Sequence, residues 1–325
     1  MPEAVPGASP QVVVIGSVNI DHVVVADAFP SPGETLLGRT AYVTLGGKGA
    51  NQAAAAASGG VRTAMIARVG EDAEADRARA RLVAGGVDVD AVTTVSGAET
   101  GTAWITTAAG DNTIVVVAGA NHQWPPEGDP TEGLGAQAAV VLAQLEIPLD
   151  VVRRAADACR GRFLLNAAPA AELPDDLIAR CDVLIVNEHE QAMVSGQSAT
   201  DGAKEAEGTP ETAAIRKAHE ALRARGAKAV VTTLGEAGAV VTDADGVSTA
   251  LRAVPTTVVD TTGAGDAFAG VLAARLAAGD SLLDAARLGI AAGSMAVRVS
   301  GAPQQYADLA TLRALAPTLP PSEKD

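Results

Sequence analysis

The sequence predicts an α/β protein with an open, mostly parallel sheet flanked by helices, and with a small second β-sheet that forms a lid. Three observations predict it: short β-branched runs, helix-compatible stretches between the later runs, and a hairpin pattern in the first half. A chain of 325 residues with 48% hydrophobic residues can bury a substantial core. The simplest organisation is a single domain over residues 1–325, with lid segments at about 17–45 and 91–118.

The first strand is expected at Gln11 to Gly16, whose sequence is QVVVIG. This run is apolar without alternation, which is typical of a central strand buried on both faces of a parallel sheet. Similar runs predict further strands at residues 61–68, 138–145, 162–166, 182–187 and 228–234.

Helix-compatible stretches lie between or after the later runs, at residues 150–159, 211–225 and 265–278. The alternation of strand and helix predicts a sheet covered by helices, and ligands of such sheets bind at the carboxyl ends of the strands. The polar segment 196–210 predicts a surface loop.

The lid is expected from a different pattern. Residues 102–108 and 113–117 flank the polar turn Gly110-Asp111-Asn112, which predicts a β-hairpin. Together with residues 21–25 and 40–45, this hairpin can form a small second sheet.

Composition excludes several classes of function. The net charge of −15 predicts no general attraction to nucleic acid or anionic lipid, so local groups must hold any phosphate ligand. Residues 1–10 lack the basic start and apolar core of a signal peptide, and no uninterrupted apolar run is long enough to span a bilayer. A cytoplasmic protein is therefore expected. Cys159 and Cys181 are the two cysteines, which predicts neither a disulfide framework nor a structural metal site.

The most informative segment is TTGAGDAF, residues 261–268, where Asp266 follows the turn Gly263-Ala264-Gly265 at the start of a long apolar helix. Free N–H groups at a helix N-terminus attract phosphate, and glycines let the backbone approach it closely. A carboxylate at this place can take a proton from a hydroxyl that attacks the phosphate. In isolation, an ordinary glycine-rich turn with Asp266 favoured by the helix dipole is an equal alternative.

A second candidate site is LGGKGANQ, residues 45–52, a glycine turn that enters an Ala-rich helix. It is not a P-loop, because Gly49 follows Lys48 where Ser or Thr is required, and the later glycine turn lacks the third glycine of a Rossmann fingerprint. Lys48 beside Asn51 is well placed to hydrogen-bond a polyhydroxylated ligand. The alternative is a helix-entry turn with Lys48 in water.

Two weaker signals follow predicted strands. Asn19 and Asp21 lie after the first strand and can point the same way in an extended segment, although such residues at strand ends usually form turns. The segment Asn187-Glu188-His189-Glu190 offers carboxylates where a phosphate-bound Mg²⁺ or its waters could sit. Alone, this segment is equally a helix N-terminus.

Taken together, these segments resemble the ribokinase/PfkB carbohydrate kinase family, in order and in spacing, from Val12 to Gln305. The most specific blocks are GGKGANQ at 46–52 and DTTGAGDAF at 260–268. The others are GSVNIDH at 16–22, FPSPGET at 29–35, QLEIP at 144–148, LNAAPA at 165–170, VNEHE at 186–190 and TLGEAG at 233–238.

The resemblance implies a ribokinase-like fold and an ATP-dependent kinase that phosphorylates D-ribose at O5 to ribose 5-phosphate. Asp266 would be the catalytic base, and Gly263, Ala264 and Gly265 would form the anion hole. The implied sugar contacts are Asn19, Asp21, Gly47, Lys48, Asn51 and Glu146. The implied ATP contacts are Asn187, Thr233, Leu234, Gly235, Glu236, Ala237, Gly238 and Gly265.

The same resemblance implies two cations and a partner subunit. Glu190 would organise Mg²⁺ through water, and K⁺ would activate the enzyme from a site beside the anion hole. The implied residues of the K⁺ site are Asp260, Thr262, Ala296, Val299, Gly301 and Gln305. Lids in this family also pair subunits, so a homodimer through the β-lid is expected.

Two positions depart from the family pattern. Ile290 falls where a His or Asn commonly flanks adenine, so apolar contacts to the base are expected there. Trp104 is bulkier than the expected aliphatic residue and faces either the sugar pocket or the dimer seam, with a core or interface role favoured.

Other functions remain open. A kinase of another small sugar or nucleoside, such as deoxyribose, a ketohexose or adenosine, would share the fold. Glu146 with Asn19 and Asp21 favours a small free sugar over a nucleoside. A non-catalytic sugar-binding regulator is disfavoured, because it would not need Asp266 and an intact anion hole.

Overall fold

The structure is a computed structural model that describes residues 9–109, 111–196, 210–299, 301–302 and 305–316. Its elements, in chain order, are β1 (Val12–Ile15), β2 (Asn19–Val25), β3 (Thr40–Gly46), α1 (Lys48–Ser58), β4 (Thr63–Gly70), α2 (Ala73–Ala84), β5 (Val87–Asp88), β6 (Val92–Val95), β7 (Gly101–Ala108), β8 (Asp111–Val117), η1 (Gly119–His122), α3 (Leu134–Gln137), β9 (Val140–Ala143), α4 (Leu149–Ala158), β10 (Arg162–Asn166), α5 (Asp175–Ile178), β11 (Val183–Asn187), α6 (Glu188–Ser195), α7 (Pro210–Ala224), β12 (Val230–Thr233), η2 (Gly235–Ala237), β13 (Ala239–Thr242), β14 (Ser248–Leu251), α8 (Ala264–Ala277), α9 (Leu282–Ala296) and α10 (Leu309–Leu315).

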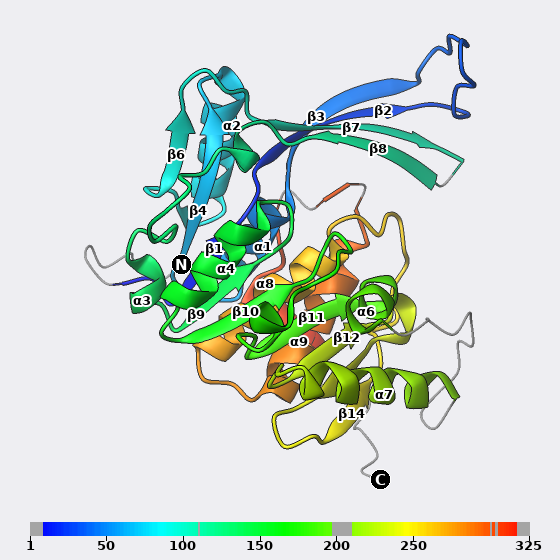
Figure 1. Ribbon diagram of the computed structural model, residues 1–325. Coiled ribbons are helices and arrows are strands. Elements are labelled where there is room, and N and C mark those ends of the chain that lie inside the picture. The colour runs from blue at the N-terminus through cyan, green and yellow to red at the C-terminus, as the bar shows by residue number, and fades with distance from the viewer. Residues whose placement is uncertain (1–8, 110, 197–209, 300, 303–304, 317–325) are drawn as a thin grey trace.

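The main sheet has the strand order β14-β13-β12-β11-β10-β9-β1-β4-β5, with β6 beside β4 (Figure 1). Its pairs are parallel except β12 with β13 and β13 with β14. The six expected strands are confirmed as β1, β4, β9, β10, β11 and β12, and the three expected helices as α4, α7 and α8. Most of the predicted loop, residues 197–209, lies outside the described residues.

Helices cover both faces of this sheet, which explains the uninterrupted apolar runs. In β1, Val12 and Val14 pack into the core on the side of α1, α8 and α9. The alternate residues Val13 and Ile15 pack into the core on the side of α4 and α5. All four are fully buried, as a period of two along a two-faced central strand requires.

Helix α8 lies between α1 and α9 and is buried from Asp266 to Leu276. A helix that is apolar all round is stable only inside a protein, so α8 forms part of the core. The buried carboxylate of Asp266 in its first turn is therefore an exception that needs a polar environment. Within the described residues, no helix is both long and apolar enough to cross a membrane.

The small second sheet has the strand order β3-β2-β7-β8 and extends away from the main sheet (Figure 1). Only three residues separate the end of β1 from the start of β2, so the base of this lid lies at the carboxyl edge of the main sheet. The expected second sheet is confirmed. Whether the chain forms a single domain over residues 1–325 stays a prediction.

The side chains of the lid alternate between two faces. Asp21 lies opposite Thr44 and Ala103, whereas His22 lies opposite Val43 and Trp104. The rings of His22 and Trp104 stack with centroids 4.5 Å apart. Trp104 is therefore on the lid face opposite to Asp21.

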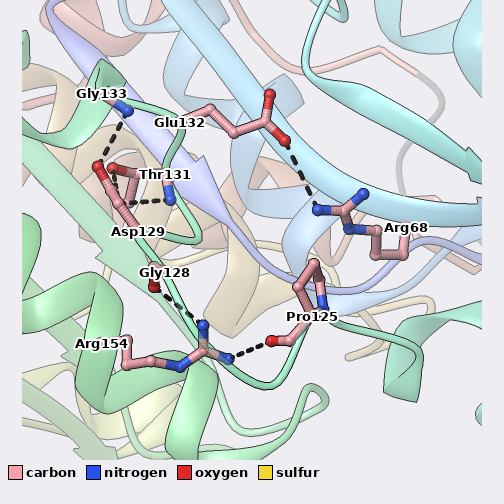
Figure 2. Close-up of polar contacts among 8 residues, drawn as sticks. All are labelled: Arg68, Pro125, Gly128, Asp129, Thr131, Glu132, Gly133 and Arg154. Carbon is pink, nitrogen blue, oxygen red and sulfur yellow. Dashed lines mark hydrogen bonds and ion pairs between the residues drawn. The ribbon is translucent and has the colours of Figure 1, made fainter.

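A loop between η1 and α3 returns the chain from the lid to the main sheet (Figure 2). The guanidinium of Arg154 on α4 donates to the carbonyls of Pro125 and Gly128, at 2.8 and 3.0 Å. Within the loop, the carboxylate of Asp129 accepts from the N–H and hydroxyl of Thr131. Although burial opposes it, these hydrogen bonds lower the pKa of Asp129.

Arg68, near the end of β4, also contacts this loop (Figure 2). Its guanidinium lies 3.5 Å from the carboxylate of Glu132 and 4.9 Å from the ring centroid of Trp124. The ion pair and the cation–π contact join β4 to residues near the two ends of this loop.

Behind the carboxyl edge, a fully buried histidine joins α7 to the sheet. His219 Nε2 lies 2.7 Å from the hydroxyl of Thr232, which donates to Gln191. A hydroxyl has one proton, so Nε2 must carry the hydrogen, and Nδ1 accepts from Thr242 at 2.6 Å. Burial lowers the pKa of His219 to about 4, so the ring is neutral at pH 7.

Replacing His219 by glutamine is expected to reduce the free energy of unfolding by about 1–3 kcal/mol at pH 8, because hydroxyls of Thr232 and Thr242 lose a partner. The pKa is near 6.5 in the unfolded chain and about 4 in the folded one. This contribution is therefore complete above pH 6.5 and is lost as the pH falls through 4.

Urea unfolding at several pH values measures both effects. The difference in unfolding free energy between wild type and His219→Gln should shrink from pH 7 to pH 4. His122→Gln, at an exposed histidine, is the control and should show no such trend. A constant difference over this range would contradict the burial argument.

Candidate active site

The carboxyl ends of β1 and β9 and the N-termini of α1 and α8 meet at one edge of the main sheet, below the base of the lid. Parallel strands bring their carboxyl ends to the same edge, so residues far apart in sequence become neighbours. Lys48 on α1 and Asp21 on the lid strand β2 both interact electrostatically with Asp266 on α8.

Glu146, just beyond β9, organises the start of α1. Its carboxylate accepts from the backbone N–H of Lys48 at 2.9 Å and from the hydroxyl of Ser17. The same hydroxyl accepts from the N–H of Gly49 at 3.2 Å, and the carbonyl of Ser17 accepts from Ala50 at 2.9 Å. Gly47 offers no side-chain cap, so Glu146 and Ser17 satisfy the free N–H groups of α1.

Two glycines allow the turn between β3 and α1. Gly47 has φ of +86°, which side chains with a Cβ rarely adopt, and a Cβ there would lie 2.7 Å from the N of Asn19. A Cβ on Gly46 would collide with the carboxylate of Asp21. The turn therefore packs directly against Asn19 and Asp21 of β2.

Asn121 on η1 holds the start of β2. Its Oδ1 accepts from the N–H of Val18 at 2.8 Å, and its Nδ2 donates to the carbonyl of Val18 at 3.0 Å and to Oδ1 of Asn19 at 2.8 Å. These bonds orient the buried amide of Asn19, whose Oδ1 is engaged.

Asp266 is hydrogen-bonded through both carboxylate oxygens to α1. Asn51 Nδ2 donates to Oδ2 at 3.0 Å, and Gln52 Nε2 donates to Oδ1 at 2.9 Å. These bonds provide the polar environment that a carboxylate in the core requires. They also join the turn of residues 45–52 to the N-terminus of α8.

Helix α8 begins after Gly263, which has φ of +78°, and no side chain in the described part of the chain caps it. The N–H of Ala264 donates to the carbonyl of Thr261 at 3.3 Å, slightly longer than the usual range. The positive end of the helix dipole thus lies beside Asp266, where an anion is favoured.

The site carries interacting acidic groups around one lysine. Burial, together with the charges of Glu146 and Asp266, raises the pKa of Asp21 to about 7. Burial lowers the pKa of Lys48, but the charges of Asp266, Glu146 and Glu190 outweigh it and raise the pKa above its ordinary value. Lys48 is therefore positively charged at neutral pH.

The opposite end of the carboxyl edge is formed by β11, α6 and β12. Asn187 and Glu190 form a capping box, with both bonds at 2.8 Å. Burial raises the pKa of Glu190 more than its hydrogen bond from Asn187 and the charge of Lys48 lower it. The turn η2 follows β12, and the N–H of Leu234 donates to the carbonyl of Gly238 at 2.8 Å.

A second loop lies beside the N-terminus of α8. Asp260 accepts from the N–H and hydroxyl of Thr262, at 2.9 and 2.7 Å, and from the N–H of Gly301 at 2.8 Å. Although burial opposes it, these bonds lower the pKa of Asp260 and keep it ionised. The N–H groups of Val259 and Asp260 donate to the carbonyl of Val297 and join the two segments.

The structure also describes the surroundings of three further residues discussed in the sequence analysis. Gln305 is exposed, and Ile290 belongs to the main core with 6% of its surface exposed. Trp104 is on the far face of the lid. The roles assigned to the remaining site residues stay predictions, although the structure brings Asp21, Lys48 and Asp266 together.

Several residues of this site carry no prediction in the sequence analysis. They are Ser17, Gln52, Asn121, Gln144, Asn166 and Tyr306. A usable signal exists for Gln144 and Asn166, because polar residues at the carboxyl ends of predicted parallel strands should converge. For Tyr306, burial and the nearby charge of Asp266 raise the hydroxyl pKa well above its ordinary value.

Comparison with known proteins assigns most of the chain to one family. Residues 9–307 match the family described as pfkB family carbohydrate kinase. The chain is 35% identical to the ribokinase of Haemophilus influenzae over 294 residues, which cover 89% of this chain and 92% of that protein. It is 32% identical to a deoxyribokinase of Salmonella typhi, over 81% of this chain and 84% of that one.

A solved structure shows the same arrangement of the chain. The Arabidopsis thaliana ribokinase complexed with ribose and ATP superposes with a TM-score of 0.85, covering 95% of this chain and 99% of that one, at 31% identity. The fold and the site together define an ATP-dependent carbohydrate kinase. The chain belongs to the pfkB family, and the resemblance noted in its sequence is confirmed.

Proposed function

We propose that the protein transfers the γ-phosphoryl group of ATP to O5 of D-ribose, giving ribose 5-phosphate and ADP. The observation that carries this proposal is the position of Asp266, which is bonded to the turn of residues 45–52 and lies at the N-terminus of α8. The similarity to a ribokinase that was solved with ribose and ATP supports the choice of substrates.

The sugar pocket is proposed to use the polar groups between the lid and α1. Asp21 from β2 and Glu146, just beyond β9, offer oxygens that accept bonds from sugar hydroxyls. Asn19, whose Oδ1 is engaged by Asn121, offers the N–H groups of its amide. Gly47, Lys48 and Asn51 offer donors. A site of this kind rejects ligands that lack a hydroxyl, because its buried polar groups would stay unpaired.

In the proposed reaction, Asp266 takes the proton of the attacking hydroxyl, whose oxygen bonds to the γ-phosphorus. The bond to the bridging oxygen breaks, and its electron pair leaves with ADP. Backbone N–H groups of residues 263–265 would stabilise the transferring group, because they carry partial positive charge without needing to reorganise. ATP would lie along Asn187 and residues 233–238.

A divalent ion, proposed to be Mg²⁺, would neutralise charge on the phosphates when it is bound. The buried carboxylate of Glu190 supplies oxygen atoms, the ligand type that this ion prefers. One of these oxygens accepts from the backbone N–H of Asn187, so we propose that Glu190 contacts the ion through water. Burial raises the pKa of Glu190 despite the opposing charge of Lys48, and a bound cation would stabilise the ionised carboxylate.

A monovalent cation, proposed to be K⁺, would be held by Asp260 and the neighbouring carbonyls. The proposed ligands are Asp260, Thr262, Ala296, Val299, Gly301 and Gln305. A carboxylate with carbonyl oxygens is a hard donor set that suits an alkali ion. Because Asp260 is hydrogen-bonded to both segments beside α8, the ion would order the anion hole without touching the substrates.

A kinase of 2-deoxyribose is the second candidate, and the similarity to a deoxyribokinase is the observation that favours it. ADP release with Mg·ATP, across ribose, 2-deoxyribose, fructose and adenosine, separates the two candidates.

In this assay we expect the highest kcat/KM with ribose and a higher rate in K⁺ than in Na⁺. Preference for 2-deoxyribose would reassign the pocket, equal rates in both salts would remove the cation site, and no turnover would indicate a non-catalytic binder.

The enzyme is proposed to be a homodimer that pairs through the outer lid face, formed by His22, Val24, Val43, Trp104, Val115 and Val117. Strand pairing places these side chains together, and Trp104 and Val115 are 56% and 65% exposed. A contiguous exposed apolar patch is typical of an interface. The use of ATP fits the expected cytoplasmic location.

Sedimentation analysis tests the dimer. We expect the mass of two chains for wild type and of one chain for Trp104→Glu, because a carboxylate cannot be buried unpaired in an apolar interface. Val247→Glu changes an equally exposed residue outside the lid and should remain dimeric. A dimer that persists in Trp104→Glu would place the interface elsewhere.

A further inference from the structure

A row of buried amides leads through the core to Asp266. Gln144 directly follows β9, Asn166 ends β10, and Gln52 lies in the first turns of α1. Gln52 and Gln144 are fully buried, and Asn166 is 7% exposed. Polar groups this deep in an apolar core are costly unless they are hydrogen-bonded, so their pairing shows what holds them.

The direction of each amide is fixed by its neighbours. Gln144 Nε2 donates to Oε1 of Gln52 at 2.8 Å. Gln52 Nε2 uses its two N–H groups on Oδ1 of Asn166 and Oδ1 of Asp266, each at 2.9 Å. Reversing the Gln52 amide would place its oxygen against both of these acceptors and its nitrogen against a donor. Gln52 is therefore a permanent donor to Asp266.

The two oxygens of Asp266 are not equivalent. Oδ1 is bonded to the fully buried Gln52, whereas Oδ2 is bonded to Asn51, which is only partly buried. Asn51 is also one of the proposed sugar contacts, so its bond to Oδ2 can be exchanged for one to the ligand. Gln52 is fully buried and is not among the proposed sugar contacts, so its bond to Oδ1 is expected to persist when the ligand binds.

We propose that Gln52 is the positioning residue of Asp266, and that Oδ2 is the oxygen that receives the proton of the sugar hydroxyl. This inference rests on the proposed role of Asp266 as the base. Holding Oδ1 removes the rotation of the carboxylate, so that Oδ2 keeps one orientation toward the attacking hydroxyl. Such alignment contributes to the rate because the reacting atoms must approach in a narrow range of geometries.

Gln144 and Asn166 are proposed to keep Gln52 in place. In the described part of the chain, Oε1 of Gln144 is buried and has no hydrogen-bond partner. Leaving an acceptor unpaired costs about 1–3 kcal/mol. Gln144 donates to Gln52 even though its own oxygen stays unpaired. This indicates that the fold retains the bond from Gln144 to Gln52. Asn166 Nδ2 is bonded to the carbonyl of Ile185 at 3.3 Å, which ties the row to β11.

The test is a graded series of methionine substitutions, which keep side-chain length and remove hydrogen bonding. Gln52→Met is expected to lower kcat by about 10- to 100-fold, since small misplacements at a reacting centre have effects of this size. KM for ribose and for ATP should stay within about threefold. Gln144→Met, one bond further away, should give a smaller loss of kcat in the same direction.

Gln191→Met is the matched control, because Gln191 is a buried glutamine that bonds Thr232 and not Asp266. It should lower thermal stability while keeping kcat within about twofold. A loss of kcat in Gln52→Met that only follows its loss of thermal stability, or a rise in KM at unchanged kcat, would overturn the inference. If Gln52→Met does not fold, an unchanged kcat in Gln144→Met would overturn the inference instead.

A double substitution separates this inference from the proposed function. In the background of Asp266→Asn, Gln52→Met should change the residual kcat by less than about twofold, because Gln52 acts through Asp266. A full additional loss would show an independent role for Gln52. If Asp266→Asn itself keeps its activity, the proposed function fails; if it is inactive while Gln52→Met keeps wild-type kcat, only this inference fails.

Discussion

Replacing Asp266 by asparagine is expected to lower kcat by roughly 10²–10⁴-fold, the contribution that a positioned general base makes. Sugar binding, measured by calorimetry, should be largely retained, because the proposed sugar contacts Asn19, Lys48 and Glu146 are held by bonds that do not involve residue 266. The hydroxyl would then attack without a group to take its proton.

The asparagine variant also has a structural effect that must be separated from the chemical one. Both oxygens of Asp266 accept an amide donor, at 2.9 and 3.0 Å. An amide at this position turns one of them into a donor, and the partly exposed Asn51 is the neighbour that can move away. We expect a loss of about 1–3 kcal/mol in the free energy of unfolding, for one unmade bond.

Asp284→Asn is the matched control for the loss of one negative charge, because Asp284 is exposed at the start of α9. Its kcat should equal that of wild type. Retained turnover in Asp266→Asn would remove Asp266 from its proposed role, whatever the change in stability.

Replacing Asp21 by asparagine is expected to have opposite effects on stability and on sugar binding. The pKa of Asp21 is about 7 in the folded protein and 3.8 in the unfolded chain. The stabilisation from its protonated form is therefore complete below pH 3.8 and is lost as the pH rises through 7. At pH 8 the ionised carboxylate costs the unliganded protein up to about 4 kcal/mol.

Asp21→Asn should thus raise the melting temperature of the unliganded protein at pH 8, and the gain should fall toward pH 4. The KM for the sugar should rise by about 100-fold, because charge-assisted bonds to hydroxyls contribute about 1.5–3 kcal/mol each. Asp27→Asn, which removes an exposed lid carboxylate that pairs with Arg39, should change neither value appreciably. An unchanged KM would remove Asp21 from the sugar site.

Much of the main sheet could be predicted from the sequence because its central strands are buried on both faces. The runs at residues 12–15 and 183–186 are apolar without alternation, and this pattern is typical of a covered parallel strand. The edge hairpin of β13 and β14 had no comparable signal, since its short strands are set by pairing with β12.

The site was predictable only where glycine turns or strand ends mark it. The turns before α1 and α8 each contain a glycine with positive φ next to a polar side chain. Glycines beside a polar residue can be recognised in the sequence. Gln52 shows no such mark, because it is one polar residue in an Ala-rich helix, and Asp266 lies 214 positions away. His219 is similar, since its partners Thr232 and Thr242 lie on strands whose approach to α7 depends on the whole fold.

Strand β2 joins two surfaces that cannot change independently. Asp21 points toward the pocket and His22 toward the outer lid face, because neighbouring residues of a strand point in opposite directions. Inserting or deleting one residue here would turn the whole strand over, so the pocket would receive the ring and the exterior the carboxylate. A lid that evolves toward another ligand must therefore keep the length of β2 and exchange only its side chains. Each exchanged residue that faces the ligand is the direct neighbour of a residue on the outer lid face.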